Sequence, residues 1–64
     1  MMQGDLVVVN VCTVYTVGGA THIALKPIVC MVFDSVALAR VGAAELVSQD
    51  GTRVLVYTKD LRRV

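Results

Sequence analysis

The sequence has few aromatic residues and few charges. Phenylalanine and tyrosine together make up 5% of the chain and tryptophan is absent, so an aromatic-lined peptide groove and a base-stacking surface for nucleic acid both have few residues to draw on. Charged residues make up 17% and the net charge is +1, whereas an average domain has about 25% charged residues. No long-range field of one sign therefore steers the chain to nucleic acid or to anionic lipid.

Cysteine and histidine are equally scarce. Cys12 and Cys30 are too few for a disulfide-framework miniprotein, and their spacing fits neither a zinc motif nor a redox motif, which favours a reducing compartment. His22 is the single histidine, and the nearest acids in sequence, Asp5 and Asp34, are remote from it. No phosphate-binding loop, dinucleotide fingerprint, zinc-protease motif or nucleophile elbow is present. The sequence predicts a non-enzymatic protein with no cofactor, no metal and no small-molecule substrate.

The 64 residues are rich in apolar side chains, which are 56% of the chain, with a mean hydropathy of +0.73. This composition excludes intrinsic disorder, and the length predicts a single small β-rich domain over residues 1–64. The start lacks the basic segment of a secretory signal. The uncharged stretch 6–25 is long enough to span a membrane, but its polar residues, glycine pair and β-branched residues argue against a spanning helix. We therefore expect a cytoplasmic protein.

Fourteen valines indicate strands, because the stiff χ1 of valine favours extended backbone. Residues 5–17 predict a first strand with both faces apolar at its start, ended by a turn at Gly18-Gly19. Residues 28–33 are uninterrupted and apolar, which predicts a strand buried on both faces. Residues 52–58 follow Asp50-Gly51, a dipeptide typical of two-residue type I′ hairpin turns, and predict a third strand.

The turn at Gly18-Gly19 also decides whether Cys12 and Cys30 can meet. If this turn has two residues, opposed residue numbers sum to 37, so that Cys30 faces Val7 and the two thiols are roughly 17 Å apart. If the loop instead runs over residues 18–24, the two cysteines lie opposite each other and a disulfide is possible. Two small buried hydrophobic residues are the simpler interpretation.

Two segments are harder to assign. Residues 35–48 fit either a helix capped by Asp34 or Ser35, or strands on both sides of a kink at Gly42. The strand interpretation is favoured because the Asp50-Gly51 turn needs a partner strand immediately before it. The alternative is a three-stranded sheet with one helix at about 35–47. Residues 59–64 predict a single helical or 3₁₀ turn that points Arg62 and Arg63 to solvent.

The order of these features resembles that of small SH3-like barrels of bacterial and phage proteins. The resemblance rests on Gly4-Asp5 before a hydrophobic strand, the Asp50-Gly51 hairpin, the strand RVLVYT and the closing turn KDLRRV, and it covers residues 4–9 and 44–64. It implies a mostly β fold, a small SH3-like β-barrel. It carries no function, because this chain has too few aromatic residues for the peptide groove of such domains.

The strands predict a partner, because both faces of each secure strand are apolar and one small core covers only one face. We therefore predict a small interaction protein that forms a homo-oligomer and docks on a larger protein assembly. The alternative is a nucleic-acid-binding module that contacts phosphates through basic residues near the C-terminus. These partner-binding or nucleic-acid-binding candidates are Arg53, Lys59, Arg62 and Arg63.

Overall fold

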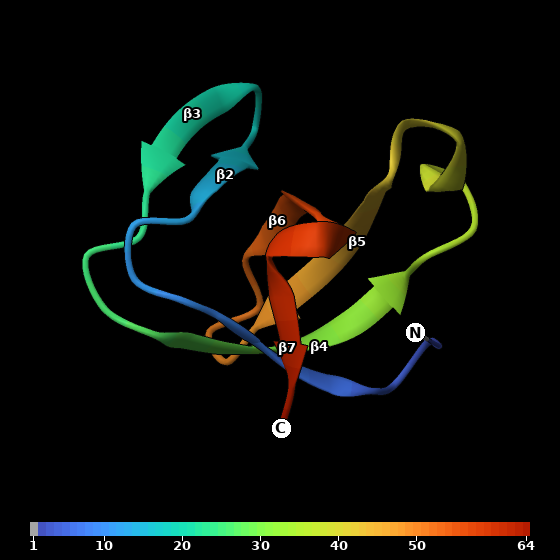
Figure 1. The fold of residues 1–64 in the computed structure, drawn as a ribbon, viewed down its shortest axis with the longest axis horizontal. Helices are drawn as coiled ribbons and strands as arrows, with labels where there is room; N and C mark the ends of the chain where they lie inside the picture. The colour runs from blue at the N-terminus through green and yellow to red at the C-terminus, as the bar shows by residue number, and fades with distance from the viewer. Residues whose placement is uncertain (1) are drawn as a thin grey trace.

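The computed structural model describes residues 2–64 as one open antiparallel sheet of short strands (Figure 1). The strand order is β3-β2-β6-β5-β4-β1-β7. The β-rich fold predicted from the sequence is confirmed. The strands are β1 (Leu6–Val9), β2 (Val14–Val17), β3 (Ala20–Ile23), β4 (Ile28–Asp34), β5 (Ala43–Ser48), β6 (Arg53–Tyr57) and β7 (Leu61–Arg63).

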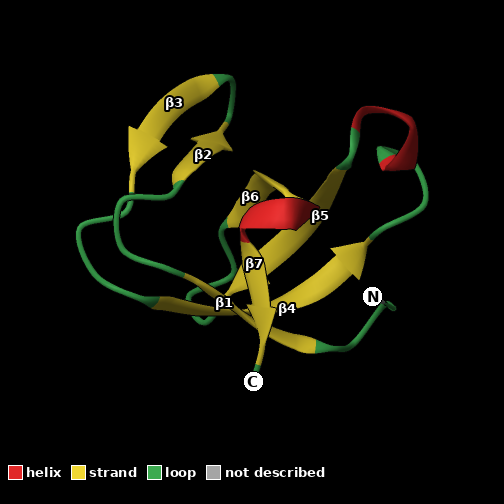
Figure 2. Ribbon diagram, in the orientation of Figure 1, coloured by secondary structure: helices red, strands yellow, loops and turns green. Residues whose placement is uncertain are grey.

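Among the described residues 2–64, helical backbone is confined to two short 3₁₀ turns, Ala39–Val41 and Thr58–Asp60 (Figure 2). The predicted alternative, a three-stranded sheet with a helix at about 35–47, is wrong, because the helical backbone of this segment is limited to the short 3₁₀ turn Ala39–Val41. Within residues 2–64, no helix has the length and apolar content that crossing a membrane requires.

The predicted strand over residues 5–17 is divided in the structure into β1 and β2. Its middle turns because Cys12 adopts a left-handed backbone with φ of 70° and the Thr13 N–H donates to the Asn10 carbonyl at 3.1 Å. The Cys12 N–H donates to the Ala24 carbonyl at 2.7 Å, which holds this turn against the returning chain. A non-glycine residue with positive φ is uncommon, and no pattern of apolar residues reveals it.

The turn predicted at Gly18-Gly19 is confirmed. Both glycines have positive φ, 56° and 85°, and Val17 pairs with Ala20, as in a two-residue type I′ hairpin. The register implied by this turn extends beyond the hairpin, because Val7 of β1 pairs with Cys30 of β4.

The two cysteines are therefore apart, and both are free thiols. Cys30 is buried, as predicted for a small hydrophobic residue, whereas Cys12 is exposed in its turn. The alternative register that would oppose Cys12 and Cys30 is wrong. Burial raises the pKa of the Cys30 thiol, and the negative charge of Asp50 adds to this effect.

Residues 35–48 form a loop, a 3₁₀ turn and then β5. The favoured strand interpretation, with Val36, Leu38 and residues 46–49 extended on either side of Gly42, is confirmed for residues 46–48, which belong to β5. It is wrong for Val36 and Leu38, which precede the 3₁₀ turn, and for Gln49, which lies in the loop after β5. Gly42 ends that turn with φ of 72°, and its N–H donates to the Ala39 carbonyl at 3.1 Å. A residue with a Cβ is strained in this left-handed conformation, so glycine fits here.

The Asp50-Gly51 hairpin has a three-residue loop over residues 49–51 instead of the predicted two-residue turn. Of these residues only Gly51 has a positive φ, 88°, and the Ser48 N–H donates to the Thr52 carbonyl at 2.9 Å. Three-residue loops commonly combine a type I turn with one left-handed residue. The predicted turn over residues 59–64 is right only at its start, because Leu61–Arg63 forms β7 alongside β1.

The core lies on one side of the sheet, since directly opposed residues of antiparallel strands point to the same side. β4 alternates along its length, with Cys30 and Val32 buried and Met31 exposed, so the prediction that this strand is buried on both faces is wrong. Tyr15, Val17, Ile28 and Leu61 pack partly against the core. The buried residues of the core cluster are Val7, Val9, Ala24, Cys30, Val32, Ala44, Leu46, Val54 and Val56.

The exposed apolar side chains are not a sign of loose folding. The accessible surface is 4354 Å², close to the roughly 4,000 Å² that a compact protein of this mass presents. The excess of apolar residues is therefore carried on the surface of a compact molecule.

Leu46 is the largest fully buried side chain, and it tests the one-sided core. We expect Leu46→Ala to lower the free energy of unfolding by about 2–5 kcal/mol, because the buried methyl groups are lost and a cavity remains. That loss is comparable to the whole stability of roughly 3–10 kcal/mol for a chain of this length. Urea unfolding followed by circular dichroism measures it. Leu25→Ala is the matched control, since Leu25 is 90% exposed, and an equal loss in both variants contradicts the assigned core.

Candidate interaction surfaces

The side of the sheet opposite the core is apolar across four strands. Leu6 of β1 pairs with Met31 of β4, and Met31 pairs with Val47 of β5, so these three side chains form one row. Met31 lies in the middle of this row and is 45% exposed. We define the outer face as ten side chains of β1, β4, β5 and β6 on this side: Leu6, Val8, Val29, Met31, Phe33, Glu45, Val47, Arg53, Leu55 and Tyr57. Asp34, which pairs with Glu45, and Arg62, which pairs with Val8, border this face.

Two charged side chains within the outer face, Glu45 and Arg53, neutralise each other. Arg53 forms an ion pair with Glu45, with 3.3 Å between Nη1 and Oε2. The guanidinium of Arg53 also lies 3.6 Å from the centre of the Phe33 ring. An exposed ion pair adds little stability, but the cation–π contact and the carboxylate together fix Arg53 against the sheet.

The structure separates the predicted basic residues from one another. Arg62 and Arg63 are consecutive in β7 and point to opposite sides, because they pair with Val8 and Val7 respectively. Arg63 forms an ion pair with Asp5, with 3.3 Å between Nη2 and Oδ2. Lys59 lies in the 3₁₀ turn Thr58–Asp60, with its ammonium 5.9 Å from the centre of the Tyr57 ring.

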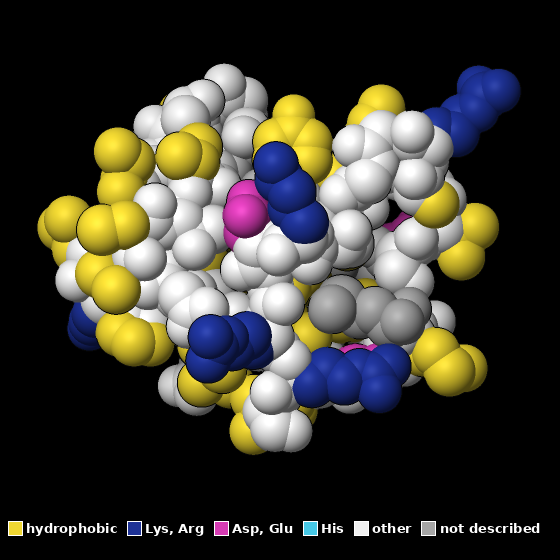
Figure 3. Space-filling view, in the orientation of Figure 1, with side chains coloured by type: hydrophobic (Ala, Val, Ile, Leu, Met, Phe, Trp, Pro, Cys, Tyr) yellow, Lys and Arg dark blue, Asp and Glu magenta, His cyan; other side chains and the backbone are white. Residues whose placement is uncertain are grey.

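Arg53 and Arg63 are thus each paired with a carboxylate, and Lys59 and Arg62 are the two predicted residues without such an ion pair in residues 2–64. Figure 3 shows the Lys and Arg side chains as separate groups with apolar and neutral surface between them. This arrangement gives a surface of mixed character in place of a continuous basic patch.

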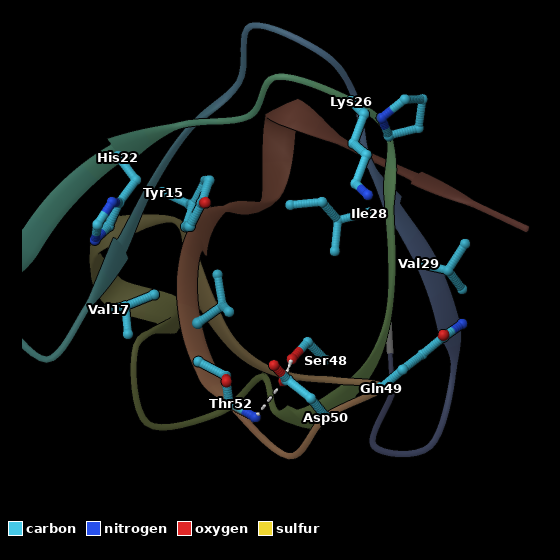
Figure 4. Close-up of a pocket in the computed structure, with 12 residues that line it drawn as sticks. Tyr15, Val17, His22, Lys26, Ile28, Val29, Ser48, Gln49, Asp50 and Thr52 are labelled. Carbon is cyan, nitrogen blue, oxygen red and sulfur yellow. Dashed lines mark hydrogen bonds between the residues drawn. The ribbon is translucent and has the colours of Figure 1, made fainter.

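A wide groove of about 710 Å³ lies between the β2–β3 hairpin and the loop at residues 49–51. Figure 4 shows Lys26 on one side of the groove and Ser48, Asp50 and Thr52 on the other. On the hairpin side, the rings of Tyr15 and His22 stack with 5.4 Å between their centres and 22° between their planes. The only histidine is therefore occupied by a structural contact in β3.

The Asp50 carboxylate stabilises the hairpin loop that carries it. It accepts hydrogen bonds from the Ser48 hydroxyl and, at 3.0 Å, from the Thr52 N–H. Hydrogen bonds to the charged form lower the pKa of Asp50 to about 2, with the Ser48 hydroxyl as the largest cause. Two backbone N–H groups, of Val36 and then of Ala37, lower the pKa of Asp34 in the same way.

No group of three or more His, Cys, Asp or Glu side chains that could hold a metal ion is found among residues 2–64. Comparison with known protein families, curated proteins and solved structures finds no match to the chain.

Sequence reasoning missed two arrangements at these surfaces. The stack of Tyr15 on His22 follows from the Gly18-Gly19 turn, because its register pairs these two residues, so a signal was present in the sequence. The contact of Arg53 with Glu45 and Phe33 depends on the register of β4, β5 and β6, and no local sequence pattern indicates it.

The Asp50 contacts predict a measurable pKa change. We expect Ser48→Ala to move the pKa of Asp50 from about 2 toward its ordinary value, because the largest source of the shift is removed. Carboxyl chemical shifts followed by NMR from pH 1 to pH 6 measure this change. Thr58→Ala removes a hydroxyl that donates to the Gly42 carbonyl instead and serves as the control. An unchanged Asp50 titration in Ser48→Ala contradicts the assignment.

The same shift carries a direction for stability. A carboxylate whose pKa is lowered by folding stabilises the protein above its unfolded pKa of about 3.9, and this contribution is lost as pH falls through about 2. The melting temperature of the wild type should therefore fall over this interval more than that of Asp50→Asn.

Proposed function

We propose that this chain is a small non-enzymatic interaction protein that self-associates through its outer face and docks on a larger protein assembly. The observation that carries the proposal is the outer face itself. Its apolar side chains stay exposed although the core is complete and the molecule is compact. Contiguous exposed apolar surface of this kind typically marks an interaction site.

A second copy is the partner that this surface fits best. Glu45 and Arg53 neutralise each other within one chain, so these two charges do not oppose contact between two outer faces. A two-fold axis near Met31 would place the apolar row of one copy against the same row of the other, as in an isologous dimer. A standard interface needs about 800 Å² from each partner, which is under a fifth of the 4354 Å² surface.

We also propose that the sheet is of the SH3-like class. The order of elements supports this assignment: a first strand, a projecting hairpin β2–β3, three consecutive antiparallel strands β4, β5 and β6, a 3₁₀ turn, and a last strand beside the first. The exposed free thiol of Cys12 suits a reducing cytoplasm, which is the compartment we propose.

Nucleic-acid binding through Arg53, Lys59, Arg62 and Arg63 receives less support. Two of these side chains are held by carboxylates, and Arg62 and Arg63 point to opposite sides of their strand. A phosphate would have to displace Glu45 and Asp5 to contact Arg53 and Arg63. Bound nucleic acid is therefore one of the outcomes that the Met31→Lys experiment distinguishes.

Met31→Lys tests the outer face at its centre. We expect this variant to lower the molar mass of the assembly, because two lysines would be brought together in an apolar contact. Size-exclusion chromatography with light scattering measures the mass, and absorbance at 260 and 280 nm reports nucleic acid that co-purifies.

Val36→Lys is the matched control, since Val36 is an exposed apolar residue, 82% accessible, that lies outside the strands. It should leave the molar mass unchanged. An assembly that is insensitive to Met31→Lys counts against the outer face, and excess absorbance at 260 nm that disappears in an Arg62→Ala, Arg63→Ala variant favours the nucleic-acid alternative.

A further inference from the structure

The edge strands of the sheet are β3 and β7, and only β7 carries charged residues that disfavour pairing with a further strand. β7 has three residues, of which Arg62 and Arg63 are charged. Short length and charge are the usual devices that keep an edge strand from pairing. β3 at the other end has no charged residue, no proline and no register irregularity, and all four of its residues are exposed.

The backbone groups of β3 alternate between the two sides of the strand. The Ala24 N–H donates to the Thr13 carbonyl at 2.9 Å, and the Ala24 carbonyl accepts from the Cys12 N–H at 2.7 Å. Ala24 therefore turns both backbone groups toward the β2 side. By alternation, His22 does the same, while the N–H and C=O groups of Thr21 and Ile23 point away from β2. No strand of residues 2–64 lies on that side of β3.

We infer that β3 pairs, antiparallel and about a two-fold axis at His22, with β3 of a second copy of this chain. In this register Thr21 of each copy lies opposite Ile23 of the other. The outward N–H of each residue then donates to the outward C=O of its opposite residue. Both outward N–H groups and both outward C=O groups of each copy are then hydrogen-bonded.

The side chains suit this pairing. Thr21 and Ile23 are β-branched and lie on the same side of the sheet as the outer face. Ile23 pairs with Val14 of β2. Val14 and Thr16 point to the same side of β2, and Thr16 pairs with Leu55 of the outer face. Cross-strand pairs of β-branched residues stabilise antiparallel sheets. The absence of charge on β3 means that two copies approach without repulsion. An edge whose donors and acceptors complement themselves fits a second copy.

Edge pairing uses a surface different from the outer face. A two-fold axis normal to the sheet keeps each outer face on the same side, so that two copies lie side by side and their outer faces stay open for contact with other copies. The two interfaces can therefore operate together, and we expect assemblies of more than two chains.

Thr21→Pro tests the edge while sparing the hairpin, because proline removes only an outward N–H and is tolerated on an edge strand. Thr21→Val keeps that N–H and is the matched control. Light scattering over a range of concentrations should show that Thr21→Pro lowers the molar mass to that of a dimer, that Thr21→Val does not change the wild-type mass, and that Thr21→Pro combined with Met31→Lys is a monomer. Circular dichroism checks that each variant is folded.

The variants separate this inference from the proposed function. If Thr21→Pro lowers the mass and Met31→Lys does not, the edge pairing stands and the outer-face proposal fails. If Met31→Lys lowers the mass and Thr21→Pro does not, the edge pairing is wrong. A monomeric wild type overturns both.

Hydrogen exchange of the Met31→Lys protein measures the edge without altering β3. The amides of Thr21 and Ile23 have no partner strand within one chain, so they should exchange rapidly in dilute solution and become protected as the concentration rises. The His22 amide points toward β2 and should be protected throughout, which makes it an internal control. If the exchange of Thr21 and Ile23 does not depend on concentration, the inference is overturned. The same result is expected if β3 pairs instead with an extended segment of a different protein, so that case also counts against the inference.

Discussion

The two apolar faces of short valine-rich strands constrain everything else in this molecule, because 64 residues supply enough chain to cover only one of them. The covered side forms a core of small aliphatic residues around Leu46. The other side keeps Met31, Leu55 and their neighbours at the surface. No long helix is available to lie across that side, since the helical segments of residues 2–64 are single turns. One apolar side of the sheet therefore stays at the surface of the molecule.

Much of the sheet could be predicted because its information is local. The glycine pair at residues 18 and 19 sets a register that also places Cys30 opposite Val7 in the neighbouring pair of strands. Apolar segments that contain valine locate β1, β4 and β6. The break at Cys12 could not be predicted, because a left-handed cysteine depends on a contact with Ala24 that the apolar pattern does not contain. The loop before β5 could not be predicted either, because its composition is compatible with helix, strand and turn.

The surfaces were predictable to different degrees. Alternation of side chains along each strand indicates two apolar faces, and the structure has one of them exposed. The basic residues look like a cluster in sequence, but strand geometry sends Arg62 and Arg63 to opposite sides, and pairing across strands brings Glu45 to Arg53. That β3 is an edge could not be predicted, because it follows from the pairing of Thr16 with Leu55, which are distant in sequence.

The shared register of β2 with β3 and of β1 with β4 has a consequence for how the chain folds. Both pairs share the register of one long hairpin that closes outward from the glycine turn. The hairpin is interrupted over residues 10–13 and 24–27, where the Cys12 N–H donates to the Ala24 carbonyl. Each step of such a closure brings together residues that the previous step has already placed near each other, so little additional loop entropy is lost. β5 and β6 form a second local hairpin. We expect these two hairpins to form early, and the pairing of β7 with β1, which joins the two ends of the chain, to form last.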